Sequence, residues 1–187
     1  MKRAPGELRL IGGQYRSRRL AVPDLPGLRP TPDRVRQTLF DWLAPVIEGA
    51  RVLDAFAGSG ALGLEALSRG AARVCFIEQA GPAVAAIRSA LASLGASERA
   101  ELIQADALSR LRAGGGPYDL VFLDPPYAAG LLAPALAALP GWLAPGHRIY
   151  LEWPGAARPP LPAGARWLRE KQAGQVSFGL LSLEPPP

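Results

Sequence analysis

Apolar and polar positions follow two alternating periods along most of this chain. Short apolar runs with the spacing of a strand are each followed by a stretch in which apolar residues recur every three or four positions. Such an alternation predicts an α/β fold, a mostly parallel sheet with helices on both faces. We predict strands at residues 51–56, 73–78, 100–104, 118–123 and 147–152, and helices at residues 60–69, 82–94, 106–112 and 129–139.

A hairpin-like segment and a further helix precede this alternating part. Residues 8–22 predict two short strands joined through Gly12 and Gly13. A loop then leads to a helix whose start is marked by Thr31 as N-cap and Pro32 at the first helical position. The expected apolar face of that helix comprises Val35, Leu39, Trp42, Leu43 and Val46.

Two strands are expected after the alternating part. They cover roughly residues 165–171 and 175–183 and are joined near Gly174. We therefore expect a Rossmann-like domain over residues 31–187 and a basic extension over residues 1–30.

The composition narrows the classes of protein to consider. With 49% hydrophobic and 20% charged residues among 187, the chain has an ordinary globular composition. It has no apolar run long enough to span a bilayer and no apolar signal-peptide core near residue 1, so we expect a cytoplasmic protein. The single cysteine, Cys75, excludes a disulfide within the chain, and the single histidine, His147, argues against a histidine metal site. We expect no metal, and a monomer.

Positive charge is concentrated in one segment. Residues 1–36 hold nine basic and three acidic side chains, a net charge of +6, whereas the whole chain carries +5. A basic segment on a nearly neutral domain favours a polyanionic partner, above all nucleic acid. The alternative is an arginine-rich surface produced by a GC-biased genome.

An aromatic ring lies among the cations of this segment, as is common on RNA-binding surfaces. Three of the arginines fall at or near the start of the first helix, where they are better placed to hold a phosphate or carboxylate than to stabilise the helix. The candidate RNA-binding residues are Tyr15, Arg16, Arg18, Arg19, Arg29 and Arg34, with Arg36 close by in the helix.

The first chemical signal lies in residues 51–60, RVLDAFAGSG. Gly58 and Gly60 can adopt backbone angles closed to other residues, and they let a ligand approach the main chain. Residues 58–63 also satisfy the G-x-G-x-x-G dinucleotide fingerprint. Asp54 would repel a pyrophosphate, however, and suits a cationic ligand such as S-adenosylmethionine. The motif favours a methyl donor over NAD, and an ordinary glycine turn is the alternative.

Acidic side chains follow the next two strands, at the edge where ligands of such sheets bind. Glu78 comes twenty positions after Gly58, where a carboxylate would accept the hydroxyls of a ribose; an exposed loop carboxylate is the alternative. Asp106, with Ala107 beside it, would either accept the amino group of an adenine or cap the helix that begins there. Both interpretations stay open.

The most specific signal is Asp124-Pro125-Pro126-Tyr127, directly after the strand YDLVFL. Each proline lacks an N–H and keeps the preceding residue out of helical geometry, so the turn is stiff and extended. An amino nitrogen on a nucleobase is a poor nucleophile because its lone pair is delocalised into the ring. The Asp124 carboxylate and the Pro125 carbonyl would orient that lone pair toward an electrophilic methyl group, with the base stacked on Tyr127. A purely structural turn is the alternative.

Taken together, these residues make the chain resemble class I S-adenosylmethionine-dependent methyltransferases that modify exocyclic amino groups, whose signature is (D/N/S)PP(Y/F). It is more similar still to one bacterial family, the 16S ribosomal RNA guanine-N2 methyltransferases named for position 966. The similarity is carried by LRLIGGQYRSRRL, GLRPTPDRVRQTLFDWL, VLDAFAGSGALGLEALSRGA, LIQADAL, FLDPPY and REKQAGQVSF. The block RPTPDRVRQTLF discriminates this family, because the other motifs occur in many methyltransferases.

The resemblance implies a seven-stranded sheet with the last strand antiparallel, and methyl transfer from S-adenosylmethionine to the N2 amino group of one guanine in small-subunit 16S ribosomal RNA. It implies that Asp124, Pro125, Pro126 and Tyr127 hold the guanine. The implied donor contacts are Asp54, Phe56, Ala57, Gly58, Ser59, Gly60, Glu78, Gln79, Asp106 and Ala107. Gln79 departs from the acidic or small polar residue expected after Glu78.

Three other functions compete with this one. A DNA adenine-N6 methyltransferase would use the same tetrapeptide, but the chain shows no target-recognition domain for DNA. A noncatalytic RNA-binding ribosome-assembly factor would be expected to have lost Asp54, Gly58 or Asp124, and all three are present. An NAD-linked oxidoreductase would need a substrate domain and a separate catalytic acid or base, and we identify neither.

Overall fold

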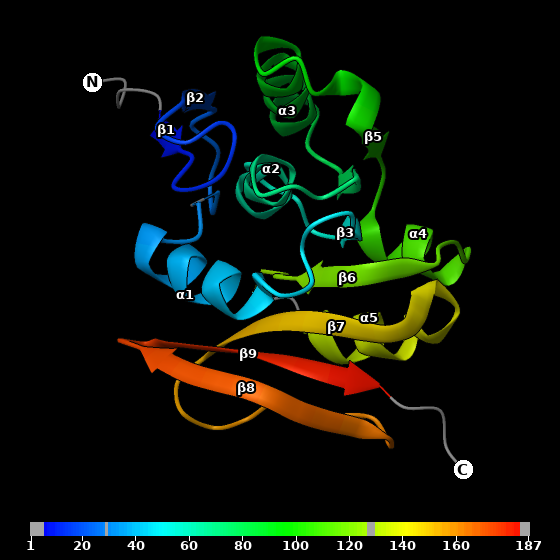
Figure 1. The fold of residues 1–187 in the computed structure, drawn as a ribbon. Coiled ribbons are helices and arrows are strands. Elements are labelled where there is room, and N and C mark those ends of the chain that lie inside the picture. The colour runs from blue at the N-terminus through cyan, green and yellow to red at the C-terminus, as the bar shows by residue number, and fades with distance from the viewer. Residues whose placement is uncertain (1–5, 29, 127–129, 184–187) are drawn as a thin grey trace.

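The computed structural model describes residues 6–28, 30–126 and 130–183. Its centre is a seven-stranded sheet with the strand order β5-β4-β3-β6-β7-β9-β8 (Figure 1). The strands are β3 (Arg51–Asp54), β4 (Arg73–Glu78), β5 (Ala100–Gln104), β6 (Tyr118–Leu123), β7 (Leu143–Pro154), β8 (Ala165–Ala173) and β9 (Val176–Leu183). Neighbours from β5 to β7 are parallel, and β9 runs antiparallel to both β7 and β8. The expected mostly parallel sheet with an antiparallel last strand is confirmed.

The order of the strands creates a switch point in the middle of the sheet. The chain first builds outward from β3 through β4 to β5, and then returns to add β6 on the other side of β3. The connections on the two sides of β3 and β6 therefore diverge, which leaves a crevice at the carboxyl ends of these two strands. Ligands of open α/β sheets bind in such a crevice, so this edge contains the candidate site.

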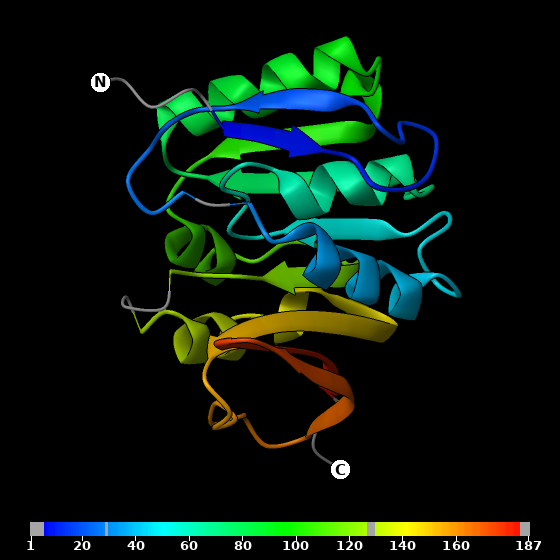
Figure 2. The same ribbon diagram turned by 90° about the vertical axis from the view of Figure 1, so that its left-hand side faces the viewer.

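Helices cover both faces of the sheet, as the alternation of periods predicts (Figures 1 and 2). The helices are α1 (Asp33–Leu43), α2 (Ala61–Ser68), α3 (Gly81–Ser93), α4 (Ala107–Arg112) and α5 (Leu132–Ala137), with 3-10 turns η1 (Ser97–Arg99) and η3 (Pro140–Trp142). The longest of them, α3, has 13 residues. No helix in the described ranges has both the length and the apolar character needed to cross a membrane.

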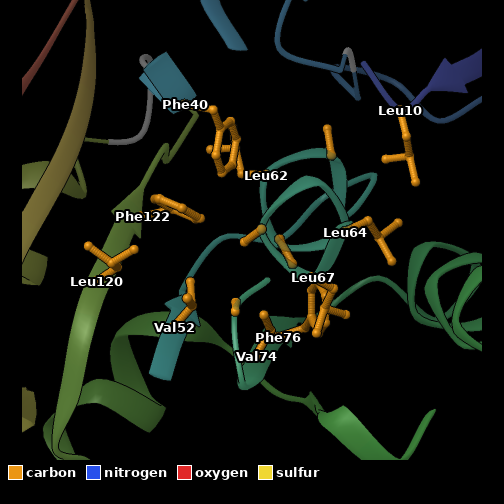
Figure 3. Packing of buried hydrophobic residues seen from close by; sticks show 14 of the residues in the cluster. Leu10, Phe40, Val52, Leu62, Leu64, Leu67, Val74, Phe76, Leu120 and Phe122 are labelled. Atoms are coloured by element: carbon orange, nitrogen blue, oxygen red, sulfur yellow. The ribbon is translucent and has the colours of Figure 1, made fainter. Parts of the chain in front are cut away.

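Successive strand residues point into two separate cores, because side chains alternate across a pleated sheet. Val52, Phe76 and Phe122 belong to the core shared with α1, α2 and α3 (Figure 3). Their neighbours Leu53 and Ile77 belong to the core beneath α4 and α5. Parallel strands buried on both faces need apolar residues at nearly every position, which explains the continuous apolar runs of the sequence.

The predicted N-terminal hairpin is present as a separate two-stranded antiparallel sheet, β1 (Gly6–Arg9) and β2 (Arg19–Val22), whose strands are connected by residues 10–18. Leu8, Leu10, Leu20 and Val22 are buried in the same core as α2 and α3. The hairpin lies alongside these two helices in both views (Figures 1 and 2). The division into an extension of residues 1–30 and a domain of residues 31–187 stays a prediction.

Several expected boundaries need correction. Helix α1 begins at Asp33, one residue later than predicted, and Pro32 occupies the N-cap. Thr31 makes no side-chain cap, and its carbonyl instead accepts a hydrogen bond from Arg36 Nε at 3.1 Å. Val46 lies beyond the end of α1 and is 40% exposed, so it does not belong to the buried face.

Two more elements differ in length from the prediction. The described helix α5 covers Leu132–Ala137 rather than residues 129–139. Strand β7 runs from Leu143 to Pro154, well beyond the predicted residues 147–152, because it pairs with β6 on one side and with β9 on the other. Pairing with partners distant in sequence extends a strand past its locally apolar positions.

Candidate functional site

The turn between β3 and α2 is tightly packed. Gly58 and Gly60 have φ angles of +53° and +77°, in the left-handed region that favours glycine. A Cβ atom on Gly60 would lie 2.9 Å from Ile87 Cγ1 of α3, closer than side-chain atoms pack. The turn therefore requires glycine both for its backbone angles and for its close approach to α3.

Asp54 ends β3 beneath this turn and is 3% exposed. Its Oδ2 accepts a hydrogen bond from the backbone N–H of Gly63, in the first turn of α2, at 3.0 Å. Burial raises the pKa of Asp54 to about 7; the Gly63 bond lowers it, and the charge of Glu78 raises it. A cationic ligand at the turn would favour the ionised carboxylate, so the site fits S-adenosylmethionine better than it fits a pyrophosphate.

Glu78 ties the turn to the start of α3. One carboxylate oxygen accepts from the N–H of Gly58 at 2.8 Å, and the other accepts from the N–H of Ala80 at 2.7 Å. An ionised carboxylate has about four lone-pair positions, so these two bonds still leave acceptor capacity for ribose hydroxyls. The neighbouring Gln79 is exposed. Glu78 thus positions the turn, and its predicted contact with the donor stays a prediction.

The remaining residues predicted to contact S-adenosylmethionine lie at or near the carboxyl ends of the same strands. Asp106 caps α4, since its Oδ1 accepts from the N–H of Ser109 at 2.8 Å. The side-chain and backbone hydrogen bonds to Ser109 lower the pKa of Asp106. The capping interpretation is therefore confirmed, and contact with an adenine stays a prediction. Ala57, Ser59 and Ala107 are buried, and Phe56 is half-buried.

The Asp124-Pro125-Pro126 turn follows β6 at the switch point, beside the end of β3. The register aligns Asp54 with Phe122, so Asp124 lies just beyond Asp54 along the neighbouring strand. Burial raises the pKa of Asp124 well above its usual range, and the charges of Glu152 and Asp54 raise it further. The two predicted carboxylates are therefore brought together. Tyr127 lies outside the described residues.

A third carboxylate, Glu152, lies at this edge and is not among the site residues predicted from the sequence. It follows Leu151 of β7, which is aligned with Leu123 of β6, so Glu152 and Asp124 are at equivalent positions on neighbouring parallel strands. Glu152 is 5% exposed, and its Oε1 accepts from the Tyr150 hydroxyl at 2.7 Å. An acidic residue at the carboxyl end of a predicted strand was the available signal, the same one that identified Glu78.

A cavity of about 220 Å³ adjoins the Asp124-Pro125-Pro126 turn. Apolar side chains make up most of its wall. Its lining includes Pro125, Pro126, Leu131, Glu152, Trp153 and Pro159. Among the described residues that line it, only Glu152 carries a charge.

Two of the candidate RNA-binding arginines lie at a second cavity, of about 330 Å³, between the hairpin connection and the start of α1. Arg16 and Arg34 line this cavity and are exposed, and within the described ranges neither pairs with a carboxylate. Arg9 and Asp33, which also line it, pair with each other at 3.1 Å. The cavity therefore has an excess of positive charge.

The other candidates have partners within the protein. Arg18 donates to the Ser93 carbonyl at 3.0 Å, and Arg19 pairs with Glu7 at 3.1 Å. Tyr15 is half-buried against the core, and its hydroxyl accepts from Arg99 at 3.1 Å. Arg29 lies outside the described residues.

Arg36 points inward rather than toward a ligand. It is 1% exposed and donates to Asp33 Oδ1 at 2.6 Å and to Glu65 Oε2 at 3.3 Å. The Arg36 guanidinium does bind carboxylates, as its position near the helix start predicts, but these are the protein's own Asp33 and Glu65 rather than a ligand. Spacing along the sequence could not show that a cation near the start of α1 would face α2.

The single cysteine and the single histidine both lie inside the protein. Cys75 is buried, and burial raises the pKa of its thiol to about 11. His147 is buried, and its Nε2 accepts from the N–H of Leu183 at 2.9 Å. In the part of the chain that the structure describes, no three His, Cys, Asp or Glu side chains form a group suited to a metal ion.

Comparison with known proteins gives one family. The family model described as "Conserved hypothetical protein 95" matches residues 8–182. The chain is 50% identical to ribosomal RNA small subunit methyltransferase D of Escherichia coli K12, covering 96% of this chain and 91% of that protein. It is 42% identical to the Haemophilus influenzae protein of the same name, covering 95% and 94%. The solved structure of the putative methyltransferase yhhF from Escherichia coli superposes with a TM-score of 0.89 at 49% identity, covering 96% of this chain and 99% of that one.

Proposed function

We propose that this chain, which belongs to the ribosomal RNA small subunit methyltransferase D family, transfers a methyl group to the N2 amino group of one guanine in 16S ribosomal RNA. The enzyme is a methyltransferase, its donor is S-adenosylmethionine, and its substrate is ribosomal RNA of the small subunit. The observation that carries the choice of an amino group is the Asp124-Pro125-Pro126 turn beside Asp54 at the switch point. With this substrate we expect the protein to act in the cytoplasm, as a monomer.

The turn between β3 and α2, here called the donor turn, supports S-adenosylmethionine as the methyl donor. Gly58 and Gly60 bring the backbone close to a ligand, and Glu78 holds the turn through the N–H of Gly58. The buried Asp54 carboxylate favours a positive charge nearby, as a sulfonium carries. When bound there, S-adenosylmethionine supplies an electrophilic methyl group.

Asp124 and the Pro125 carbonyl act on the other reactant. They accept hydrogen bonds from the two N2 hydrogens and so orient the nitrogen lone pair toward the methyl group. Transfer of the methyl group to N2 would release one proton from that nitrogen and leave S-adenosylhomocysteine as the second product. The raised pKa of Asp124 suits its carboxylate to hold that proton.

The guanine has to leave any helical stack to reach this edge of the sheet. An amino group in a stacked, paired base cannot approach acceptors at the end of a strand, so the target is single-stranded or flipped out. Arg16 and Arg34, at the basic cavity beside the hairpin, would hold phosphates of the RNA backbone. Such contacts position the RNA and carry no sequence information.

The test uses purified protein, radiolabelled S-adenosylmethionine, and small subunits from cells that lack the endogenous enzyme. After digestion to nucleosides we expect the label in N2-methylguanosine. DNA and protein-free 16S ribosomal RNA serve as parallel substrates. Label in N6-methyladenine from DNA, or absence of label from every RNA while donor binding is intact, would contradict the proposal.

A further inference from the structure

Glu152 is a buried carboxylate at the carboxyl ends of the central strands, beside Asp124. The proposed methyl transfer gives this residue no role. Glu152 follows the last pair of the β6–β7 ladder, Leu123 and Leu151, and Asp124 occupies the same position on the neighbouring chain segment. Its charge raises the pKa of Asp124, so the two carboxylates are close in space as well as in register. Burying a second acid beside Asp124 costs free energy, since like charges repel strongly where solvent is excluded. The position of Glu152 is therefore not explained by its charge stabilising the fold, and a role in function would account for it.

The Glu152 side chain is held in place rather than free to turn to solvent. The hydroxyl of Tyr150, a fully buried residue, donates to Glu152 Oε1 at 2.7 Å. This bond is one of the interactions that hold the Glu152 carboxylate, which has roughly four lone-pair positions in all. A fixed carboxylate of this kind is a preorganised hydrogen-bond acceptor.

The cavity beside the Asp124-Pro125-Pro126 turn shows what such an acceptor would meet. Its wall is formed by prolines and apolar side chains, including Pro125, Leu131 and Trp153, with Glu152 as the charged residue among those described. Small-molecule sites are typically apolar cavities in which a few oriented polar groups fix the ligand, and a flat base fits such a cavity. A nucleobase held by Asp124 through its amino group would lie against these same residues.

Guanine and adenine present opposite groups next to the amino group. In guanine the ring nitrogen N1, adjacent to the carbon that bears N2, carries a hydrogen. In adenine the ring nitrogen N1, adjacent to the carbon that bears N6, carries a lone pair instead. A carboxylate accepts from the first and is repelled by the second.

We propose that Glu152 accepts a hydrogen bond from N1–H of the target guanine and thereby determines the choice of guanine over adenine. This inference rests on the proposed function. Asp124 and the Pro125 carbonyl hold the two amino hydrogens, and Glu152 holds the third donor on the same edge of the base. The three acceptors match guanine and leave adenine with a lone pair facing a carboxylate.

The test compares two bases that share the reactive group. Small subunits are assembled with 16S ribosomal RNA that carries either guanine or 2-aminopurine at the position methylated by the wild-type protein. 2-Aminopurine keeps the 2-amino group but has a lone pair at N1. We expect the wild-type kcat/KM to be at least about tenfold lower on 2-aminopurine, the scale of one lost base-specific contact.

The variant Glu152→Gln is expected to change this preference rather than merely lower activity. A glutamine amide can donate to the N1 lone pair of 2-aminopurine, so the guanine/2-aminopurine ratio of kcat/KM should fall about tenfold or more. Glu98→Gln, the same change at an exposed position, should leave the ratio unaltered. Thermal unfolding and S-adenosylmethionine binding of each variant are measured alongside.

The possible outcomes separate this inference from the function on which it rests. Equal wild-type activity on the two bases would overturn the inference, and this result needs no variant. An unchanged ratio in Glu152→Gln would overturn it as well, since a merely structural carboxylate affects both bases alike. If the wild type methylates no RNA at all, the proposed function fails and the inference fails with it.

Discussion

Arg36 Nη1 lies 3.3 Å from Glu65 Oε2, and this buried ion pair joins α1 to α2. The Glu65 carboxylate also accepts hydrogen bonds from the backbone N–H groups of Ile11 and Gly12, at 3.0 and 2.9 Å. Arg69 Nε donates to Glu65 Oε1, the oxygen that also accepts from Gly12, at 2.8 Å. One carboxylate thus fastens the hairpin connection and α1 to the helix that begins at the donor turn.

Breaking this pair should destabilise the protein strongly. Arg36→Met removes one of the two arginines paired with the buried Glu65 and also the donor to the Thr31 and Arg9 carbonyls. We expect the free energy of unfolding to fall by about 3 kcal/mol, the low end of the range for a broken buried pair, because Arg69 still pairs with Glu65. Arg9→Met removes an exposed partner of Asp33 and should cost at most about 1 kcal/mol. Urea denaturation followed by circular dichroism measures both. Similar losses in the two variants would show that the buried pair has no special weight.

Asp54 should make the ligand-free protein less stable as the pH rises. Its pKa in the folded state, about 7, lies above its ordinary value of 3.8, so its stabilising contribution is complete below about pH 4 and is lost as the pH rises through 7. Asp54→Asn removes this dependence while its side-chain oxygen can still accept from the N–H of Gly63.

The titration of Asp54 can be detected by comparing the free energies of unfolding of the variant and the wild type at two pH values. From pH 5 to pH 8, the stability of Asp54→Asn relative to the wild type should rise by on the order of 2 kcal/mol. Denaturant unfolding at the two pH values measures this difference. A constant difference would mean that Asp54 titrates at the same pH in the folded and unfolded protein.

Asp124→Ala should separate methyl transfer from donor binding. The variant loses an acceptor on the target amino group, so we expect kcat to fall at least about a hundredfold. The affinity for S-adenosylmethionine, measured by calorimetry, should stay within severalfold, because the donor turn is held by Glu78 and Asp54. Near-normal methylation would remove Asp124 from the reaction.

Arg16 and Arg34 should contribute to the salt dependence of RNA binding. Each is exposed at the basic cavity, whereas Arg18 and Arg19 already bond to Ser93 and Glu7. If each neutralises one phosphate, the double alanine variant should reduce the slope of log affinity against log salt by between about 1 and 2.

A matched control distinguishes this contribution from net charge. Arg73→Ala removes an exposed cation at the start of β4, at the opposite end of the strands from the candidate site, and should leave the slope unchanged. Filter binding of 16S ribosomal RNA over a range of salt concentrations gives the slopes. If the Arg16/Arg34 double variant shows the wild-type slope, the basic cavity does not bind the RNA backbone.

Local sequence patterns were sufficient to predict the elements that depend on neighbouring residues alone. The predicted bounds of residues 73–78, 100–104 and 118–123 coincide with β4, β5 and β6. The central strands β4 and β6 are covered on both faces and need nearly continuous apolar runs, whereas β5 is a partly exposed edge strand. The glycine turn and the Asp124-Pro125-Pro126 turn could also be predicted from the sequence, since glycine and proline determine the local backbone conformation directly.

Contacts between residues that are distant in the sequence depend on how the elements pack. Arg36 bonds to Glu65 and Gly58 bonds to Glu78, and both pairs are far apart in the sequence. The grouping of Asp54, Asp124 and Glu152 arises because β3, β6 and β7 lie side by side in one parallel sheet. Periodicity reports which face of an element is buried, but the identity of the partner depends on strand order and register, which are set by packing across the whole chain.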